Sequence, residues 1–172
     1  MPLIRYPVLQ YAYVVQDIED ACMQWVELIG AGPFFVSMHH ESPDHFYRGK
    51  PSEADLSYAF GQAGPAHIQL IEQHNDAPSV YREMVPAGER GFHHFAILPD
   101  DFDGEKARFE AAGFPAVTTL TSAARVAYMD TRPKLGCFVE IYENNAPLLE
   151  TFASWKAAHE AWDGVTDPVR ES

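Results

Sequence analysis

The sequence contains few basic residues. It has 12 Lys and Arg against 25 Asp and Glu among 172 residues, so its formal net charge is −13. A chain this acidic repels nucleic-acid phosphates and anionic lipid unless basic residues gather in one patch, and its arginines are scattered along the sequence. We therefore expect no nucleic-acid partner and no membrane partner. A small molecule is the expected partner of any binding site.

Cysteines and long apolar runs are also scarce. Cys22 and Cys137 lie far apart without a Cys-X-X-Cys pair, which favours reduced thiols over a disulfide framework or a zinc ribbon. No run approaches the roughly 18 apolar residues of a membrane span, and Arg5 and Gln10 interrupt the segment where a signal peptide would lie. These absences predict a cytoplasmic protein.

One pattern occurs twice in the chain. Residues Gln10 to Asp17 alternate like a strand and end in an aspartate that can cap a helix, and a helical apolar stripe then runs to Gly30. Residues His94 to Asp101 repeat the same strand and aspartate, and a second helical segment ends at Gly113. Gln10 therefore corresponds to His94.

The ends of the two halves correspond as well. Residues 57–75 and 125–145 each contain a strand, a turn and a second strand. Gln69 of the first half therefore corresponds to Glu140 of the second. The first half has a longer connection, near Met38 to Glu53. Each half is thus predicted to be a β-α-β-β-β module that is too small to bury its own sheet face.

We predict an α+β fold in a single domain, residues 1–172. Two tandem modules, about 8–73 and 91–143, form one curved eight-stranded incomplete barrel. The linker 74–90 is expected to hold a short helix near 79–84, and residues 163–172 are expected to fray. A C-terminal helix at about 146–162 carries Trp155 and Trp162, which are expected to pack it against the barrel or against a second subunit of a homodimer.

Side chains alternate along a strand, which assigns each residue to one face of the sheet. The bulkier side chains, such as Tyr13 and Phe95, are expected to face the helices, and His93 is expected to point the same way. Four polar residues are then left on the concave face: Gln10, Gln69, His94 and Glu140. Isolated buried polar groups each cost a few kcal/mol, so four together predict a shared partner.

The pattern resembles the vicinal oxygen chelate superfamily, which includes glyoxalase I, methylmalonyl-CoA epimerase, extradiol dioxygenases and bleomycin resistance proteins. The stretch with two histidines and a downstream aspartate is the more specific part of this resemblance, and the duplication strengthens it. The resembling stretches are Gln10-Tyr-Ala-Tyr-Val-Val-Gln-Asp17-Ile, Gly32-Pro-Phe34, Ile68-Gln-Leu-Ile-Glu72, Gly91-Phe-His-His-Phe-Ala96 with Asp101, and Phe138-Val-Glu140-Ile.

The resemblance implies a metal site. In this superfamily the first and last strand of each module supply the ligands of a divalent ion, which here implies Gln10, Gln69, His94 and Glu140. Two of these ligands are amide oxygens, so weak binding of Zn, Ni, Co, Mn or Mg is expected. A ring-cleaving dioxygenase needs two histidines and one carboxylate at its iron, and Gln10 occupies one of those histidine positions.

The resemblance also implies a function. A metal-dependent lyase, isomerase or epimerase of the glyoxalase type would move a proton next to a carbonyl of a small carbonyl compound or thioester, with Glu140 as the base. The alternative is a metal-free protein of the bleomycin-resistance kind that sequesters a small apolar ligand. The expected pocket residues for either function are Tyr58, Phe60, His67, Tyr128 and Tyr142.

Three histidines lie in the long connection of the first half: His39, His40 and His45. Their neighbours Glu41, Ser42, Pro43 and Asp44 are typical of a solvated loop. We therefore expect a loop that folds over the pocket mouth rather than a metal site made of these three histidines.

Overall fold

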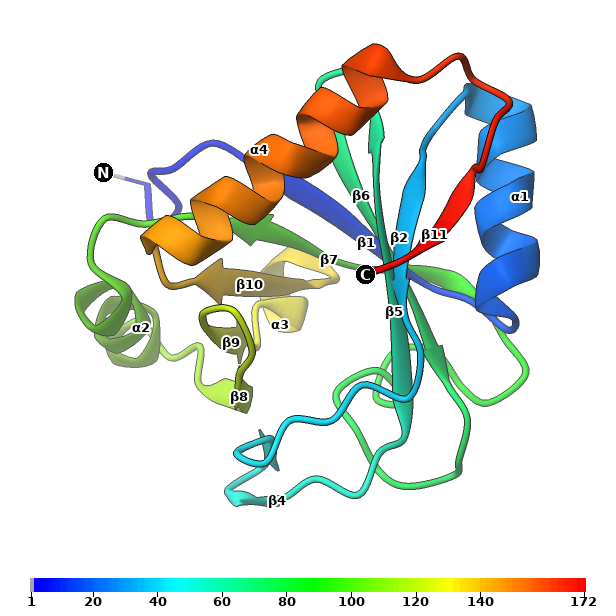
Figure 1. Cartoon of the computed structure of the whole chain (residues 1–172). Coiled ribbons are helices and arrows are strands. Elements are labelled where there is room, and N and C mark those ends of the chain that lie inside the picture. Colours follow the sequence, from blue (N-terminus) through cyan, green and yellow to red (C-terminus); the bar gives the residue numbers. More distant parts are fainter. Residues whose placement is uncertain (1) are drawn as a thin grey trace.

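The structure, a computed structural model, describes residues 2–172. Within them, eleven strands form one mixed sheet in the order β11-β2-β5-β6-β1-β7-β10-β9-β8-β3-β4, and four helices surround it. The sheet curves strongly and does not close on itself (Figure 1). The prediction of an α+β fold with a curved, incomplete barrel is therefore confirmed, although the sheet has eleven strands rather than the expected eight.

The first half starts with a strand and a capped helix, as predicted. Asp17 accepts a hydrogen bond from the amide of Asp20 at 2.8 Å, and Gly30 ends the helix with a left-handed φ of 67° that suits glycine. The elements of this half are β1 (Gln10–Val14), α1 (Ile18–Ile29), β2 (Phe34–Ser37), β5 (Leu56–Ala63) and β6 (Ala66–Gln73).

The second half has the same beginning, with Asp101 accepting a hydrogen bond from the amide of Gly104 at 3.0 Å. In both halves the first strand pairs in parallel with the last one, and β1 and β7 join the halves in antiparallel orientation. The elements are β7 (Gly91–Ile97), α2 (Phe102–Ala111), β8 (Ala116–Thr121), β9 (Arg125–Met129), α3 (Arg132–Leu135) and β10 (Phe138–Tyr142).

The three additional strands lie in segments expected to be irregular. β3 (Phe46–Tyr47) and β4 (Lys50–Pro51) form a small hairpin in the long connection, and β3 pairs with β8 of the other half. β11 (Val169–Glu171) pairs in parallel with β2, so the C-terminal segment is not frayed as expected. β11 extends one edge of the sheet, and β3 and β4 extend the other. The periodicity within a segment does not reveal such pairing, because the partner strand lies elsewhere in the sequence.

The linker also differs from its prediction. Residues 80–84 form turns rather than the short helix that was expected. The amides of Met84 and Val85 both donate to the carbonyl of Tyr81, at 3.1 and 2.9 Å, and Ser79 Oγ accepts the amide of Arg82 at 3.1 Å. The backbone therefore turns once at Tyr81 without continuing as a helix.

Helix α4 (Ala146–Ala161) lies across the open, concave side of the sheet, while α1 and α2 lie outside it (Figure 1). Trp155 of α4 stacks on Phe60 of β5 with ring centroids 4.8 Å apart, so the predicted packing of this helix against the barrel is confirmed. Among the described residues, no helix combines the length and apolarity that crossing a bilayer requires.

Candidate active site

The four polar residues predicted to share the concave face lie in two neighbouring cross-strand rows. One row consists of Gln69, Ala12 and His94, and the other of Gln10, Ala96 and Glu140. The four polar side chains are at most 3% exposed. The alanine in the middle of each row has no side chain beyond Cβ, which leaves room between the polar groups on either side.

The polar groups differ in how they are satisfied. His94 Nε2 lies 3.1 Å from Glu140 Oε2. Gln69 Oε1 is buried and has no hydrogen-bond partner among residues 2–172. The amide of Gln10 is engaged at both ends, because its Nε2 donates to His67 Nδ1 at 3.0 Å and its Oε1 accepts from the Tyr142 hydroxyl at 3.2 Å.

A β-bulge brings His93 to the same side of the sheet as His94. Ala12 pairs with His94 but the next residue, Tyr13, pairs with Phe92, so His93 is left over in the register. Its ring is fully buried and stacks on Phe138, whose side chain belongs to the concave core. The prediction that His93 points toward the helices is therefore wrong, because simple alternation does not hold across a bulge.

The bulge creates a chain of hydrogen bonds that orients His94. His93 Nε2 lies 3.0 Å from the carbonyl oxygen of Val80, which can only accept, so this nitrogen carries a proton. Burial lowers the pKa of His93 well below 6.5, so its ring is neutral and its Nδ1 is an acceptor. His94 Nδ1, at 2.8 Å, must then donate to it. His94 Nε2 is thereby left facing Glu140 as the ring nitrogen that can bind a metal or share one proton with the carboxylate.

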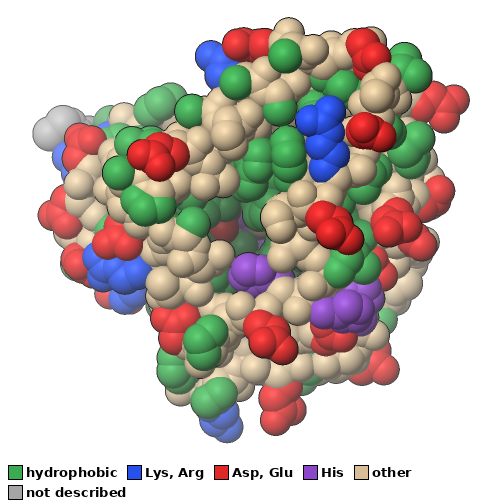
Figure 2. Space-filling model, viewed as in Figure 1, with side chains coloured by type: hydrophobic (Ala, Val, Ile, Leu, Met, Phe, Trp, Pro, Cys, Tyr) green, Lys and Arg blue, Asp and Glu red, His purple; other side chains and the backbone are tan. Residues whose placement is uncertain are grey.

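A cavity of about 200 Å³ opens above Gln69 and Glu140. Figure 2 shows a hollow on this face with hydrophobic side chains beside it and acidic side chains scattered around it. Four of the predicted pocket residues, Tyr58, Phe60, Tyr128 and Tyr142, line the cavity, and no Lys or Arg does. Helix α4 adds Leu148, Thr151, Phe152 and Trp155 to the lining. Sequence analysis missed these, although the aromatic residues of the helix were visible in the sequence.

His67, the fifth predicted pocket residue, does not line this cavity. It lies behind it, where its ring meets Phe60, Phe152 and Trp155 at centroid distances of 4.9 to 6.1 Å. Burial lowers the pKa of His67 to about 3, so the imidazole is neutral near pH 7. Its position makes it a support for the Gln10 amide rather than a wall of the pocket.

Three tyrosine hydroxyls form a buried chain beside Glu140. Tyr81 lies 3.2 Å from Tyr58 and 3.0 Å from Tyr128, measured between hydroxyl oxygens. Burial, and to a smaller degree the charge of Glu140, raises the pKa of Tyr81 and Tyr128 well above 10. These hydroxyls therefore stay protonated and act only as neutral hydrogen-bonding groups at neutral pH.

The types of donor at this site are ones that divalent ions accept. The unpartnered Gln69 Oε1 is a buried oxygen without a proton donor, and His94 Nε2 and a Glu140 oxygen already face each other at 3.1 Å. An ion held by these groups, with the remaining lone pair of Gln10 Oε1, would satisfy the orphaned oxygen.

The three histidines of the long connection do not converge. His40 lines the cavity beside Tyr58, His39 lies against Asp55, and His45 belongs to neither contact. Among the described residues, the group of possible metal ligands that contains His39 includes neither His40 nor His45. The connection contributes His40 to the cavity lining, and its strand β3 pairs with β8 of the other half.

The sheet is curved and open, and its two halves repeat the same order of strands and helix. The chain belongs to the Glyoxalase/Bleomycin resistance protein/Dioxygenase superfamily, whose family model matches residues 9–128.

Solved structures show the same fold. Methylmalonyl-CoA epimerase from Mycobacterium tuberculosis superposes with a TM-score of 0.60 at 17% identity, covering 83% of this chain and 91% of that one. A hypothetical protein from Bacillus halodurans gives a TM-score of 0.59 at 18% identity, covering 83% and 97%. Streptomyces coelicolor methylmalonyl-CoA epimerase in complex with 2-nitronate-propionyl-CoA gives 0.55 at 15% identity, covering 82% and 99%. No curated protein matches the sequence.

Proposed function

We propose that this protein is a metal-dependent enzyme that moves a proton next to a carbonyl group, as an isomerase, epimerase or lyase of the glyoxalase type. The observation that carries the proposal is Glu140, which is 1% exposed, faces His94 Nε2 and borders an apolar cavity. A carboxylate buried beside one imidazole and an apolar cavity is costly to desolvate, and such groups are typical of functional sites.

Gln10, Gln69, His94 and Glu140 are the proposed ligands. A divalent ion held there would polarise the substrate carbonyl and stabilise the negative charge that develops on its oxygen. Glu140 takes the proton from the adjacent carbon as the C–H bond breaks, and the electron pair moves to the carbonyl oxygen to form an enolate. Return of the proton by Glu140 to the neighbouring carbon gives the isomer, whereas formation of the epimer requires a proton donor on the other face of the enolate.

The lining narrows the substrate class. Aromatic side chains from β5, β9, β10 and α4 surround the reacting position, and no Lys or Arg among the lining residues offers a partner for an anionic group. A small, mainly apolar carbonyl compound or the acyl end of a thioester fits this lining, whereas phosphates of a carrier group would have to remain outside. Two of the solved relatives are methylmalonyl-CoA epimerases, which supports the thioester class.

The decisive test is the substitution Glu140→Gln. The variant keeps the side-chain volume and an oxygen ligand but removes the proton acceptor, so solvent deuterium incorporation should fall by about 10² to 10⁴-fold. The assay uses a panel of hemithioacetals, α-hydroxy thioesters and 2-methyl-branched acyl thioesters in D₂O with added divalent metal. Glu150→Gln, the same change at an exposed position of α4, is the matched control and should exchange at the wild-type rate. Equal rates in Glu140→Gln and wild type would refute the role of Glu140.

A second candidate function is metal-free sequestration of a small apolar ligand. The observation in its favour is Gln10, whose amide is satisfied at both ends by His67 and Tyr142 without any metal. A sequestering protein would bind aromatic ligands in the cavity, quench the fluorescence of Trp155 and exchange no deuterium on any substrate of the panel. Metal content after purification without chelator separates the two functions at the outset.

A further inference from the structure

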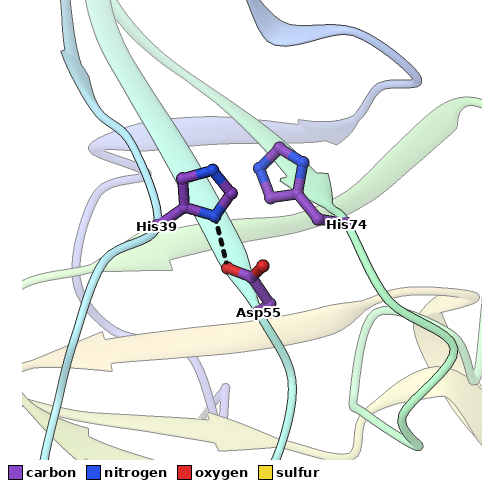
Figure 3. Close-up of side chains that lie close together, drawn as sticks. All are labelled: His39, Asp55 and His74. Atoms are coloured by element: carbon purple, nitrogen blue, oxygen red, sulfur yellow. Dashed lines mark hydrogen bonds and ion pairs between the residues drawn. The ribbon is translucent and has the colours of Figure 1, made fainter.

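A second group of metal-binding side chains lies outside the cavity. Among residues 2–172, His39, Asp55 and His74 are the one group of three or more His, Cys, Asp or Glu residues whose ligand atoms all lie within 4.8 Å of one another. His39 Nδ1 is 2.8 Å from Asp55 Oδ1, and the two imidazole rings face each other with centroids 4.4 Å apart (Figure 3). This set, the His39–Asp55–His74 cluster, contains none of the proposed ligands around Glu140.

The sheet holds the three residues together. His39 follows β2, Asp55 precedes β5 and His74 follows β6, and these three strands are neighbours in the sheet. The amide of His74 donates to the carbonyl of Asp55 at 2.9 Å, which braces the two segments directly. Ser57 Oγ accepts the amide of His39 at 3.0 Å and therefore positions the third segment. The convergence thus results from paired backbone and not from the chance approach of long side chains.

His74 is oriented in the way that metal-binding histidines usually are. Its Nδ1 lies 3.2 Å from Glu72 Oε1, while the other oxygen of Glu72 is fixed by the amide of Ile18 at 2.9 Å. A carboxylate can only accept, so Nδ1 carries the proton and Nε2 presents a lone pair, which meets the Ser57 hydroxyl at 2.7 Å. A carboxylate behind the imidazole sets the tautomer and raises the basicity of the free nitrogen.

We propose that His39, Asp55 and His74 bind a divalent transition-metal ion of the zinc class. Two imidazoles and one carboxylate are the three-ligand set that Zn²⁺ accepts together with a water molecule, and harder ions such as Mg²⁺ prefer all-oxygen sites. The side chains of His39, Asp55 and His74 are 60%, 39% and 20% exposed, so an ion reaches them from solvent without opening the fold.

At this position a bound ion would fix the connection between β2 and β5. Two of its ligands, His39 and Asp55, lie at the two ends of the connection that carries the β3–β4 hairpin, and the third belongs to the end of β6. His40, next to His39, lines the cavity. A bound ion joins both ends of this connection to the sheet and holds His40 at the cavity wall. The inference does not depend on the proposed function of Glu140.

The test is a titration of metal-free protein with Zn²⁺ by calorimetry, followed by Co²⁺ absorption spectra. His94→Ala removes the only imidazole among the proposed ligands of the candidate active site and should retain one binding event. His39→Ala and His74→Ala, each added to that background, should weaken this event at least about 100-fold, because each removes a ligand. Glu72→Gln should weaken it by about 10 to 100-fold through the loss of second-layer support. His45→Ala, which changes a histidine of the same connection outside the cluster, is the matched control and should bind like wild type.

Hydrogen–deuterium exchange supplies an independent readout. Zn²⁺ should slow amide exchange within residues 40–54 of wild type and of His94→Ala, and should leave this segment unchanged in His74→Ala. Binding that survives His39→Ala and His74→Ala, or no binding at millimolar Zn²⁺, would overturn the proposal. Failure of the proposed function would be seen differently: Glu140→Gln and wild type would incorporate deuterium into substrate at equal rates.

Discussion

At the scale of single residues, His93 shows how one extra residue in a strand can orient a neighbouring side chain of the candidate active site. The bulge turns His93 into the concave core, where it accepts a hydrogen bond from His94 Nδ1 and donates one to the carbonyl of Val80. His94 then has one ring nitrogen available, and it faces Glu140. His93 is therefore a positioning residue for the candidate active site.

This role predicts the effect of His93→Phe. The variant retains an aromatic ring against Phe138 but leaves His94 Nδ1 and the Val80 carbonyl without partners, so the free energy of unfolding should fall by about 1–3 kcal/mol. Affinity for Co²⁺ at the Glu140 site should fall by about 10 to 100-fold. Urea unfolding and calorimetry measure the two effects.

His93→Asn separates orientation from packing, because the asparagine carbonyl oxygen can replace Nδ1 as the acceptor for His94. It should recover most of the Co²⁺ affinity that His93→Phe loses, even though it fills less space. If both variants bind Co²⁺ like wild type, His93 does not position His94.

At the scale of elements, the contact between β2 and β5 depends on a glycine. A Cβ atom added to Gly61 of β5 would lie 2.7 Å from the ring of Phe34, a residue of β2 that is fully buried. The ring has no room to move in a packed core, so β2 can approach β5 only because position 61 has no side chain.

Gly61→Ala should therefore destabilise the protein by about 1–3 kcal/mol, measured as a lower midpoint of urea unfolding with an unchanged slope. Gly91→Ala, in β7, is the matched control: the nearest atom to its added Cβ is 4.0 Å away, so it should be neutral or slightly stabilising. Equal midpoints for the two variants would show that the contact with Phe34 relaxes freely.

At the scale of the whole molecule, packing of α4 against the sheet buries a histidine and makes its protonated form unfavourable. His67 lies between the sheet and α4, and burial lowers its pKa to about 3 from an ordinary value of 6.5. The unfolded chain therefore binds a proton at this residue below about pH 6.5, while the folded protein does so only near pH 3. Stability contributed by neutral His67 is complete above pH 6.5 and is lost as the pH falls toward 3.

The expected slope is about 1.4 kcal/mol of unfolding free energy per pH unit from this residue at pH 4.5–6. Urea unfolding of metal-free wild type and His67→Phe across this range measures it. The slope of the variant should be smaller by this amount, whatever its absolute stability. Parallel curves would mean that His67 takes up a proton in the folded protein.

The sequence alone determined the class of fold and the shared face of the candidate ligands. The repeated strand and aspartate, together with alternation along the strands, placed Gln10, Gln69, His94 and Glu140 on one concave face, and the structure brings them into neighbouring rows. Such inferences succeed because periodicity and helix caps are local: they depend on side chains a few residues apart.

Only the tertiary structure decided the remainder. The bulge at His93 depends on the register between β1 and β7, the strands β3 and β11 depend on distant partners, and His39, Asp55 and His74 converge because β2, β5 and β6 are neighbours. The displacement of His67 from the cavity depends on how α4 crosses the sheet. None of these features is written in the periodicity of any one segment, because each arises from pairing between residues that the chain brings together only on folding.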